Sequence, residues 1–137
     1  MGPLRNFELK QHKFTTTYVK LQQAYISEAV AIGNWSVIGY KGPGDNVNAT
    51  GNGAATSSTN NFTYTDASGW ADNTIALATG ATGFSASNKA KLNDCESAAN
   101  WTIDIAAGSA AGEATFTPST LDQTCLQLTP NWNQIGK

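Results

Sequence analysis

The residues of this 137-residue chain with the clearest capacity for chemistry are its two cysteines, Cys95 and Cys125. Each can pair with the other in a disulfide, and neither belongs to a CxxC motif or a Cys/His cluster that would hold zinc. The alternative is two buried free thiols. Charged residues make up 13% of the chain, and the middle is rich in Ala, Thr, Ser, Asn and Gly. This composition resembles that of secreted proteins, so the sequence favours a disulfide formed in an oxidising compartment.

Residues able to carry out acid–base catalysis are few. His12, the single histidine, stands among lysines on the polar side of a predicted helix, which is typical of a solvated residue rather than a general base. Asp94 and Glu96 flank Cys95, and Asp104 falls on the outer side of a predicted strand, where surface charges are ordinary. No nucleophile elbow, phosphate-binding loop or metalloprotease motif occurs. We therefore expect no catalytic residues, no cofactor and no enzymatic activity.

A loop rich in side-chain oxygens raises the question of a cation site. A twelve-residue calcium loop beginning at Asn46 would place Gly51 correctly at its sixth position. Its last position would be Ser57, where a bidentate glutamate is required. We therefore expect no bound metal.

Nucleic-acid binding would need a basic surface. Lys89 and Lys91, with Trp101 nearby in the sequence, make a small basic patch at best, and the net charge of the chain is −2. Such a chain has no positive field to attract phosphates, so we expect no nucleic-acid partner. The four tryptophans are more typical of core packing than of sugar platforms. Trp70, which follows Gly69 in a loop-like segment, is nevertheless a tentative binding surface.

One long amphipathic helix is predicted over residues 7–33. One side of it carries four apolar residues at i, i+4, i+7 and i+11, namely Phe14, Tyr18, Leu21 and Tyr25. Three threonines disfavour the helix by a few tenths of a kcal/mol each. Burial of one aromatic or leucine side chain, about 1.5–3 kcal/mol, outweighs them. Lys20 and Gln22 lie mostly off the apolar side, and Gly33 before Asn34 predicts the end of the helix.

The chain after the helix predicts short strands in which apolar and polar residues alternate. These lie at residues 62–65, 73–78, 101–105, 114–117 and 125–129, and 101–105 and 114–117 form a hairpin. Residues 35–40 form a strand or an apolar loop, 46–61 a surface excursion, and 85–92 a short helix. The predicted fold class is α+β: a long N-terminal helix packed on an antiparallel β-sheet, with a C-terminal disulfide-bounded region. Residues 1–6 are interpreted as a cloning remnant and lead-in, and 7–137 as one domain.

This layout resembles the soluble headgroup of bacterial type IV pilins and pseudopilins. Local matches are the segment KLNDC ending at Cys95, the WTI triplet at Trp101, and CLQLTPNWNQIG, which begins at Cys125. In that family an apolar N-terminal half-helix anchors the subunit in the membrane and later packs in the filament core. Residues 7–33 would be the amphipathic second half of that helix, and the two cysteines would bound the variable region.

The resemblance implies a structural subunit of an extracellular filament. It would lie in the inner membrane before assembly, held there only through an apolar segment that the sequence lacks. Its partners would be further copies or other pilin subunits and the pilus assembly machinery. The outer surface would serve adhesion, twitching motility or DNA uptake. The alternative from another class is a secreted adhesin or carbohydrate-binding module.

Overall fold

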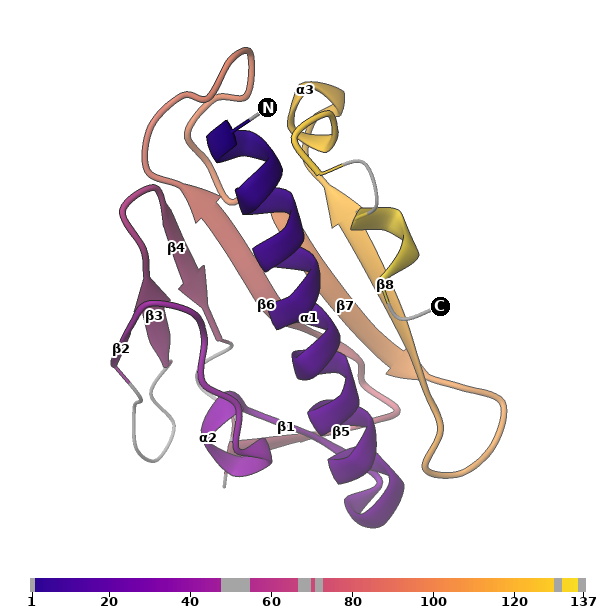
Figure 1. Ribbon diagram of the computed structural model, residues 1–137. Coiled ribbons are helices and arrows are strands. Elements are labelled where there is room, and N and C mark those ends of the chain that lie inside the picture. The colour runs from indigo at the N-terminus through magenta and orange to yellow at the C-terminus, as the bar shows by residue number, and fades with distance from the viewer. Residues whose placement is uncertain (1, 48–54, 67–69, 71–72, 130–131, 136–137) are drawn as a thin grey trace.

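The structure of the protein is a computed structural model (Figure 1). It describes the backbone of residues 2–47, 55–66, 70, 73–129 and 132–135, and the side chains of these except 2–14, 45–47 and 133. The helices are α1 (Gly2–Ala29), α2 (Trp35–Ile38), α3 (Gln123–Leu126) and a 3-10 helix (Trp132–Gln134). The strands are β1 (Ala31–Gly33), β2 (Asp45–Val47), β3 (Thr56–Ser58), β4 (Phe62–Thr65), β5 (Thr74–Ala76), β6 (Ala81–Asn88), β7 (Trp101–Ala107) and β8 (Ala114–Thr120).

Helix α1 crosses one face of a six-stranded sheet (Figure 1). Along its described side chains the buried positions recur every three or four residues, as one helix face requires; they are Thr15, Tyr18, Gln22 and Ile26. The helix ends where Val30 takes a left-handed conformation (φ 53°) and its N–H donates to the carbonyl of Ile26 at 2.9 Å. This is the usual geometry of a helix C-terminus, although glycine is the usual residue there.

The larger sheet is antiparallel throughout, in the order β2-β3-β4-β6-β7-β8. Apolar and polar residues alternate along its strands, because successive side chains point to opposite faces. In β7, for example, Trp101, Ile103 and Ile105 are buried while Thr102 and Asp104 are not. The register between β6 and β7 shifts once, between Thr82 and Phe84.

A second, two-stranded sheet pairs β1 with β5 antiparallel, with Ile32 opposite Ile75. The short helix α2 follows β1 directly. Its N-cap is Asn34, whose side-chain oxygen accepts from the N–H of Val37 at 3.0 Å. Gly39, at φ 78°, ends it with the positive φ that glycine adopts readily.

The core is centred on Phe84 of β6. Its ring lies 5.6 Å from that of Tyr18 in α1 and 5.8 Å from that of Trp35 in α2, centroid to centroid. The rings of Tyr64 in β4 and Trp132 in the C-terminal 3-10 helix lie 6.0 and 6.3 Å away. Elements from the whole length of the chain therefore meet at one aromatic residue, and each such pair adds about 0.5–1.5 kcal/mol beyond area burial.

The predicted fold class is wrong. Beyond Ala29 the described chain is predominantly β-structure, and it forms two separate antiparallel sheets instead of one sheet wrapped on a long helix. The segment predicted as the last turn of the helix, residues 31–33, is strand β1. Val30 turns the chain out of the helix. The backbone groups of residues 31–33 then form hydrogen bonds with residues 74–76 instead of continuing the helical hydrogen bonds.

Several local predictions are also corrected. Residues 85–88, predicted to begin a short helix, belong to strand β6, because alternate side chains there are buried against the core. Residues 125–129 contain the last two residues of α3 and the turn that follows rather than a strand, since Asp122 caps α3 and its carboxylate accepts from the N–H of Thr124 at 2.9 Å. Residues 35–38 are helical. The hairpin of residues 101–105 and 114–117 is confirmed as β7 and β8.

Candidate functional site

The structure joins Cys95 to Cys125 by a disulfide with a Cα–Cα distance of 4.8 Å. Both residues are fully buried. Cys125 lies in α3, and Cys95 lies in the β6–β7 connection, where it exchanges two backbone hydrogen bonds with Leu92. The bridge therefore ties the C-terminal elements to the connection that precedes β7. It closes a chain segment that contains the β7–β8 hairpin.

Two buried asparagines support the Cys95 side of this bridge. The side-chain amide of Asn100 donates to Asn88 Oδ1 at 2.7 Å and to the carbonyl of Glu96 at 2.7 Å, and lies 3.3 Å from Cys95 Sγ. The amide of Asn88 donates to the carbonyls of Ala90 and Cys95 at 3.0 and 3.1 Å. These amides add hydrogen bonds to backbone carbonyls of the irregular β6–β7 connection and so help to hold its shape. The role of the two asparagine side chains here is structural.

The predicted helix face is divided between core and surface. Tyr18 is fully buried, Leu21 and Tyr25 are partly buried against the core, and the side chain of Phe14 lies outside the described residues. Gln22, predicted to lie off the apolar side, is instead fully buried. Burial raises the pKa of the Tyr18 hydroxyl above its ordinary value. Of the described side chains of this face, Tyr18 therefore belongs to the core, while Leu21 and Tyr25 pack at its edge.

The predicted binding residue Trp70 is partly buried and packs against the core, and the residues on both sides of it lie outside the described part of the chain. Trp35, Trp101 and Trp132 are buried, and their indole N–H groups donate to Gly83 O, Thr129 Oγ1 and Ser119 O. These three side chains are therefore occupied in the core. None of the four tryptophans is among the described residues that line the polar pocket presented below.

The charged residues considered for catalysis or metal binding are also not gathered in one cluster among the described residues. Glu96 forms an exposed ion pair with Lys91 at 3.2 Å, and Asp104 is exposed on β7, where it accepts a short hydrogen bond from the hydroxyl of Thr82. The side chain of His12 lies outside the described residues, as does most of the candidate calcium loop. The part of the chain that the structure describes holds no group of three or more His, Cys, Asp or Glu side chains able to bind a metal ion.

The face of the six-stranded sheet turned away from α1 is covered by hydroxyl groups, and we call it the hydroxyl face. Its hydroxyl residues are Thr56, Ser58, Thr63, Thr65, Thr82, Ser85, Ser87, Thr102, Thr115, Thr117 and Ser119. One row runs unbroken across five strands, each residue paired with the next: Thr56, Thr65, Ser85, Thr102 and Ser119. Neighbouring residues in such a row are separated by the strand spacing of about 4.8 Å.

The chemistry of the hydroxyl face is neutral hydrogen bonding. Each hydroxyl can donate one hydrogen bond and accept two. Among the outward-pointing side chains that the structure describes on these strands, Asp104 is the one carboxylate; Asp45 of β2, whose side chain lies outside the described residues, is paired with Ser58 on the same face. Some of the capacity is used internally, since Thr102 and Ser119 lie 2.8 Å apart, oxygen to oxygen. The remainder faces solvent. This surface suits hydrated, polar and uncharged contacts.

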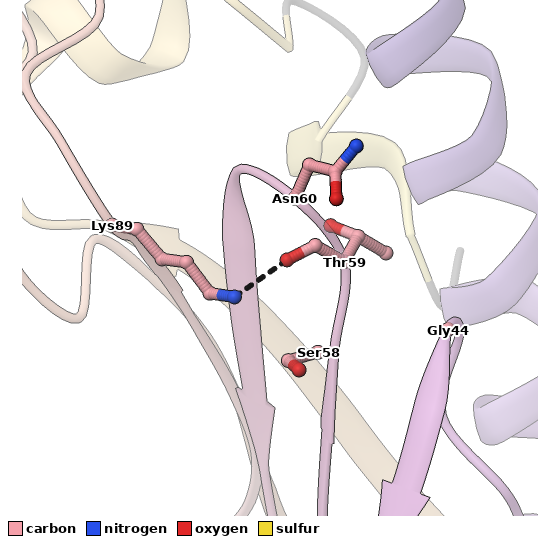
Figure 2. Close-up of a pocket in the computed structure, with 5 residues that line it drawn as sticks. All are labelled: Gly44, Ser58, Thr59, Asn60 and Lys89. Carbon is pink, nitrogen blue, oxygen red and sulfur yellow. Dashed lines mark hydrogen bonds between the residues drawn. The ribbon is translucent and has the colours of Figure 1, made fainter.

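A polar pocket of about 370 Å³ opens beside this face, lined by Gly44, Ser58, Thr59, Asn60 and Lys89 (Figure 2). Lys89 closes one side, and its ammonium donates to the carbonyl of Thr59 at 2.6 Å. Gly44 (φ 79°) closes the other. A Cβ added there would lie 2.0 Å from the carbonyl oxygen of Ser58, so this wall requires glycine. Ser58 belongs to both the hydroxyl face and the pocket.

Neither the hydroxyl face nor the polar pocket is evident from the sequence. The only available signal is a hydroxyl residue at every second position, as in Thr56-Ser-Ser58, Thr63-Tyr-Thr65 and Ser85-Ala-Ser87. These repeats become one surface only when β3, β4 and β6 are known to be neighbours, and β6 was predicted in part as a helix. The pocket joins Gly44 to Lys89, which are far apart in the sequence.

Comparison with protein-family models, with characterised proteins and with solved structures gave no match to this chain. Within the described residues, no helix is both long enough and apolar enough to cross a membrane.

Proposed function

We propose that this protein is a structural subunit of an extracellular filament of the type IV pilus or pseudopilus class. The observation that carries the proposal is the contrast between the two sides of the domain. One side is formed by α1, whose outer surface no other described element covers (Figure 1). The other is the hydroxyl face, whose described side chains are mostly uncharged and polar. A filament needs one side of its subunit to pack inward and the other to remain in contact with water.

Over residues 15–29, where the side chains of α1 are described, the exposed side carries small or polar residues. Thr17, Lys20, Ala24 and Glu28 recur at three- or four-residue intervals and are exposed. Thr17 and Ala24 have short side chains, and short side chains let a neighbouring helix approach closely. In the proposed filament this side of α1 lies toward the axis, against other copies or other pilin subunits. The hydroxyl face points outward, where adhesion, twitching motility or DNA uptake takes place.

The disulfide suits the same role. A filament outside the cell is exposed to mechanical load and proteases, and a cross-link that ties α3 to the β6–β7 connection limits unfolding of the outer hairpin. The closed segment, 30 residues in sequence separation, corresponds to a stabilisation of roughly 3–4 kcal/mol on the chain-entropy account. We propose an extracellular location, with assembly from the inner membrane, and no catalytic activity.

Site-directed labelling tests the proposal. The gene with its natural upstream sequence is expressed in its own host carrying Ala24→Cys or Thr117→Cys, and filaments sheared from the cells are treated with a bulky maleimide. Filaments should react at position 117 and be protected at position 24. The isolated domain is the control, and it should react at both positions, because both side chains are exposed in the free domain. Equal reaction at the two positions on the surface-associated protein would refute the proposal.

The alternative function, a secreted adhesin or carbohydrate-binding module, is favoured by the polar pocket beside the hydroxyl face. A free adhesin would be recovered from the medium with position 24 reactive. Binding of the isolated domain to a glycan array would support it, and loss of that binding in Trp70→Ala would place the site at Trp70 rather than at the pocket.

A further inference from the structure

The pocket beside the hydroxyl face contains a cation without a carboxylate partner among the described residues. Lys89 Nζ donates to the carbonyl of Thr59, and an ammonium group has three N–H donors, so two remain. Lys91, two residues later, differs: it forms an ion pair with Glu96. Lys89 is therefore available to a ligand and Lys91 is already paired with an acid of its own chain.

The other described side chains that line the pocket are polar and uncharged. Ser58 contributes a hydroxyl, Thr59 a carbonyl and a hydroxyl, and Asn60 an amide that both donates and accepts. Among the described residues, no aromatic or aliphatic side chain lines the pocket. An apolar ligand would find no surface to bury here, whereas a ligand with several ring hydroxyls would find matching donors and acceptors.

Charge and size narrow the choice of ligand. A single ammonium group balances one negative charge, and a phosphate dianion would need a second cation, which the lining residues do not supply. The volume of about 370 Å³ lies near the lower end of the range for small-molecule sites, about 300–1,000 Å³. One sugar ring fits this description better than an oligosaccharide.

We propose that this pocket binds a monosaccharide unit bearing a single carboxylate, such as a uronic acid. Lys89 pairs with the carboxylate, while Ser58, the Thr59 carbonyl and Asn60 engage the ring hydroxyls. The inference concerns the outer surface of the isolated domain and does not depend on filament assembly. In a filament, repetition of a weak site along many copies would raise the overall avidity.

The test is titration of the isotope-labelled domain with glucuronate, followed by amide chemical shifts. Glucose supplies the ring without the charge, and acetate supplies the charge without the ring. Glucuronate should shift the amides of Thr59, Asn60 and Lys89 selectively, and more strongly than either control at the same concentration. The effect should weaken with added salt, because exposed charge interactions are screened.

Two matched variants assign the effect to one side chain. Lys89→Gln keeps a hydrogen-bond donor but removes the charge, and should weaken glucuronate binding by about tenfold or more, the effect of losing a charge-assisted contact. Lys91→Gln should leave the affinity within about twofold. Both variants should keep the native spectrum away from the pocket. The proposal is overturned if glucose binds as tightly as glucuronate, if the two variants behave alike, or if the amides of 59, 60 and 89 do not respond.

Discussion

Gln22 and Gly33 form a reciprocal pair of hydrogen bonds. The Gln22 side-chain amide donates to the Gly33 carbonyl at 2.8 Å, and the Gly33 N–H donates to Gln22 Oε1 at 3.0 Å. The side chain of a helical residue thus takes the place of a neighbouring strand beside β1. The same amide also donates to Tyr18 Oη at 3.0 Å. This contact fixes the position of the two-stranded sheet relative to α1 and explains why a glutamine is fully buried there.

Replacement of Gln22 by alanine should therefore be strongly destabilising. The change leaves both backbone groups of Gly33 buried without their partners, at about 1–3 kcal/mol for each unsatisfied group. We expect the free energy of unfolding, measured by urea titration, to fall by about 3 kcal/mol. Lys20→Ala, an exposed change on the same helix, is the control and should stay within about 0.5 kcal/mol. Equal effects of the two changes would contradict the structural role of Gln22.

Val30→Gly should stabilise the protein. A substitution by glycine usually destabilises, because it gives the unfolded backbone more conformational freedom to lose on folding. A β-branched residue at φ 53° is strained by about 1–2 kcal/mol, and 52% of this side chain is exposed, so little packing is lost on its removal. We expect a gain of about 1 kcal/mol in the free energy of unfolding. Ala29→Gly, one residue earlier within the helix, should instead lose about 0.5–1 kcal/mol. A loss at both positions would show that Val30 makes a contact that outweighs its strain.

Tyr40→Phe should also be tolerated or stabilising. The Tyr40 hydroxyl is buried and has no hydrogen-bond partner among the described residues, and removing such a group recovers about 1 kcal/mol. Tyr18→Phe is the matched control, since it removes the acceptor for the Gln22 amide and should cost about 1 kcal/mol. Thermal and urea unfolding of the two variants at neutral pH distinguish these outcomes. A larger loss in Tyr40→Phe than in Tyr18→Phe would contradict the assignment.

Alkaline pH should unfold the protein through its buried tyrosines. Burial raises the pKa of Tyr18, Tyr40 and Tyr64 above the ordinary value of about 10. Above that pH the unfolded chain loses these protons while the folded chain keeps them, so the unfolded state binds fewer protons and stability falls as pH rises. Each group contributes about 1.4 kcal/mol per pH unit in this window. Tyr40→Phe should make the decline shallower, as followed by tyrosinate absorbance and circular dichroism.

Removal of the disulfide should destabilise without abolishing the fold. We expect Cys95→Ala/Cys125→Ala to lose roughly 3–4 kcal/mol of unfolding free energy. The wild-type protein in reductant should approach the same value once the buried bridge has been reduced in the unfolded state. The control is the double variant with and without reductant, which should be unchanged. Two alkylatable thiols in native wild-type protein without reductant would show that the bridge does not form.

The sequence alone was sufficient to identify elements whose burial follows directly from the spacing of their apolar residues. Alternation along residues 62–65, 101–105 and 114–117 identified three strands, because a half-buried strand must place every second side chain in the core. Tyr18 on a helix face, and the absence of any second partner for Cys95 or Cys125, were also readable from the residues alone.

The tertiary structure decided what depends on contacts between distant segments. Residues 31–33 became a strand because residues 74–76 pair with them, and Gln22 was buried because Gly33 offers it both a donor and an acceptor. The hydroxyl face exists only through the order of the strands, and the pocket only through the approach of Gly44 to Lys89. The physical reason is one of magnitude. Helix and strand propensities differ by a few tenths of a kcal/mol per residue, whereas the loss of one buried hydrogen bond costs about 1 kcal/mol or more, so the tertiary contact decides the local structure.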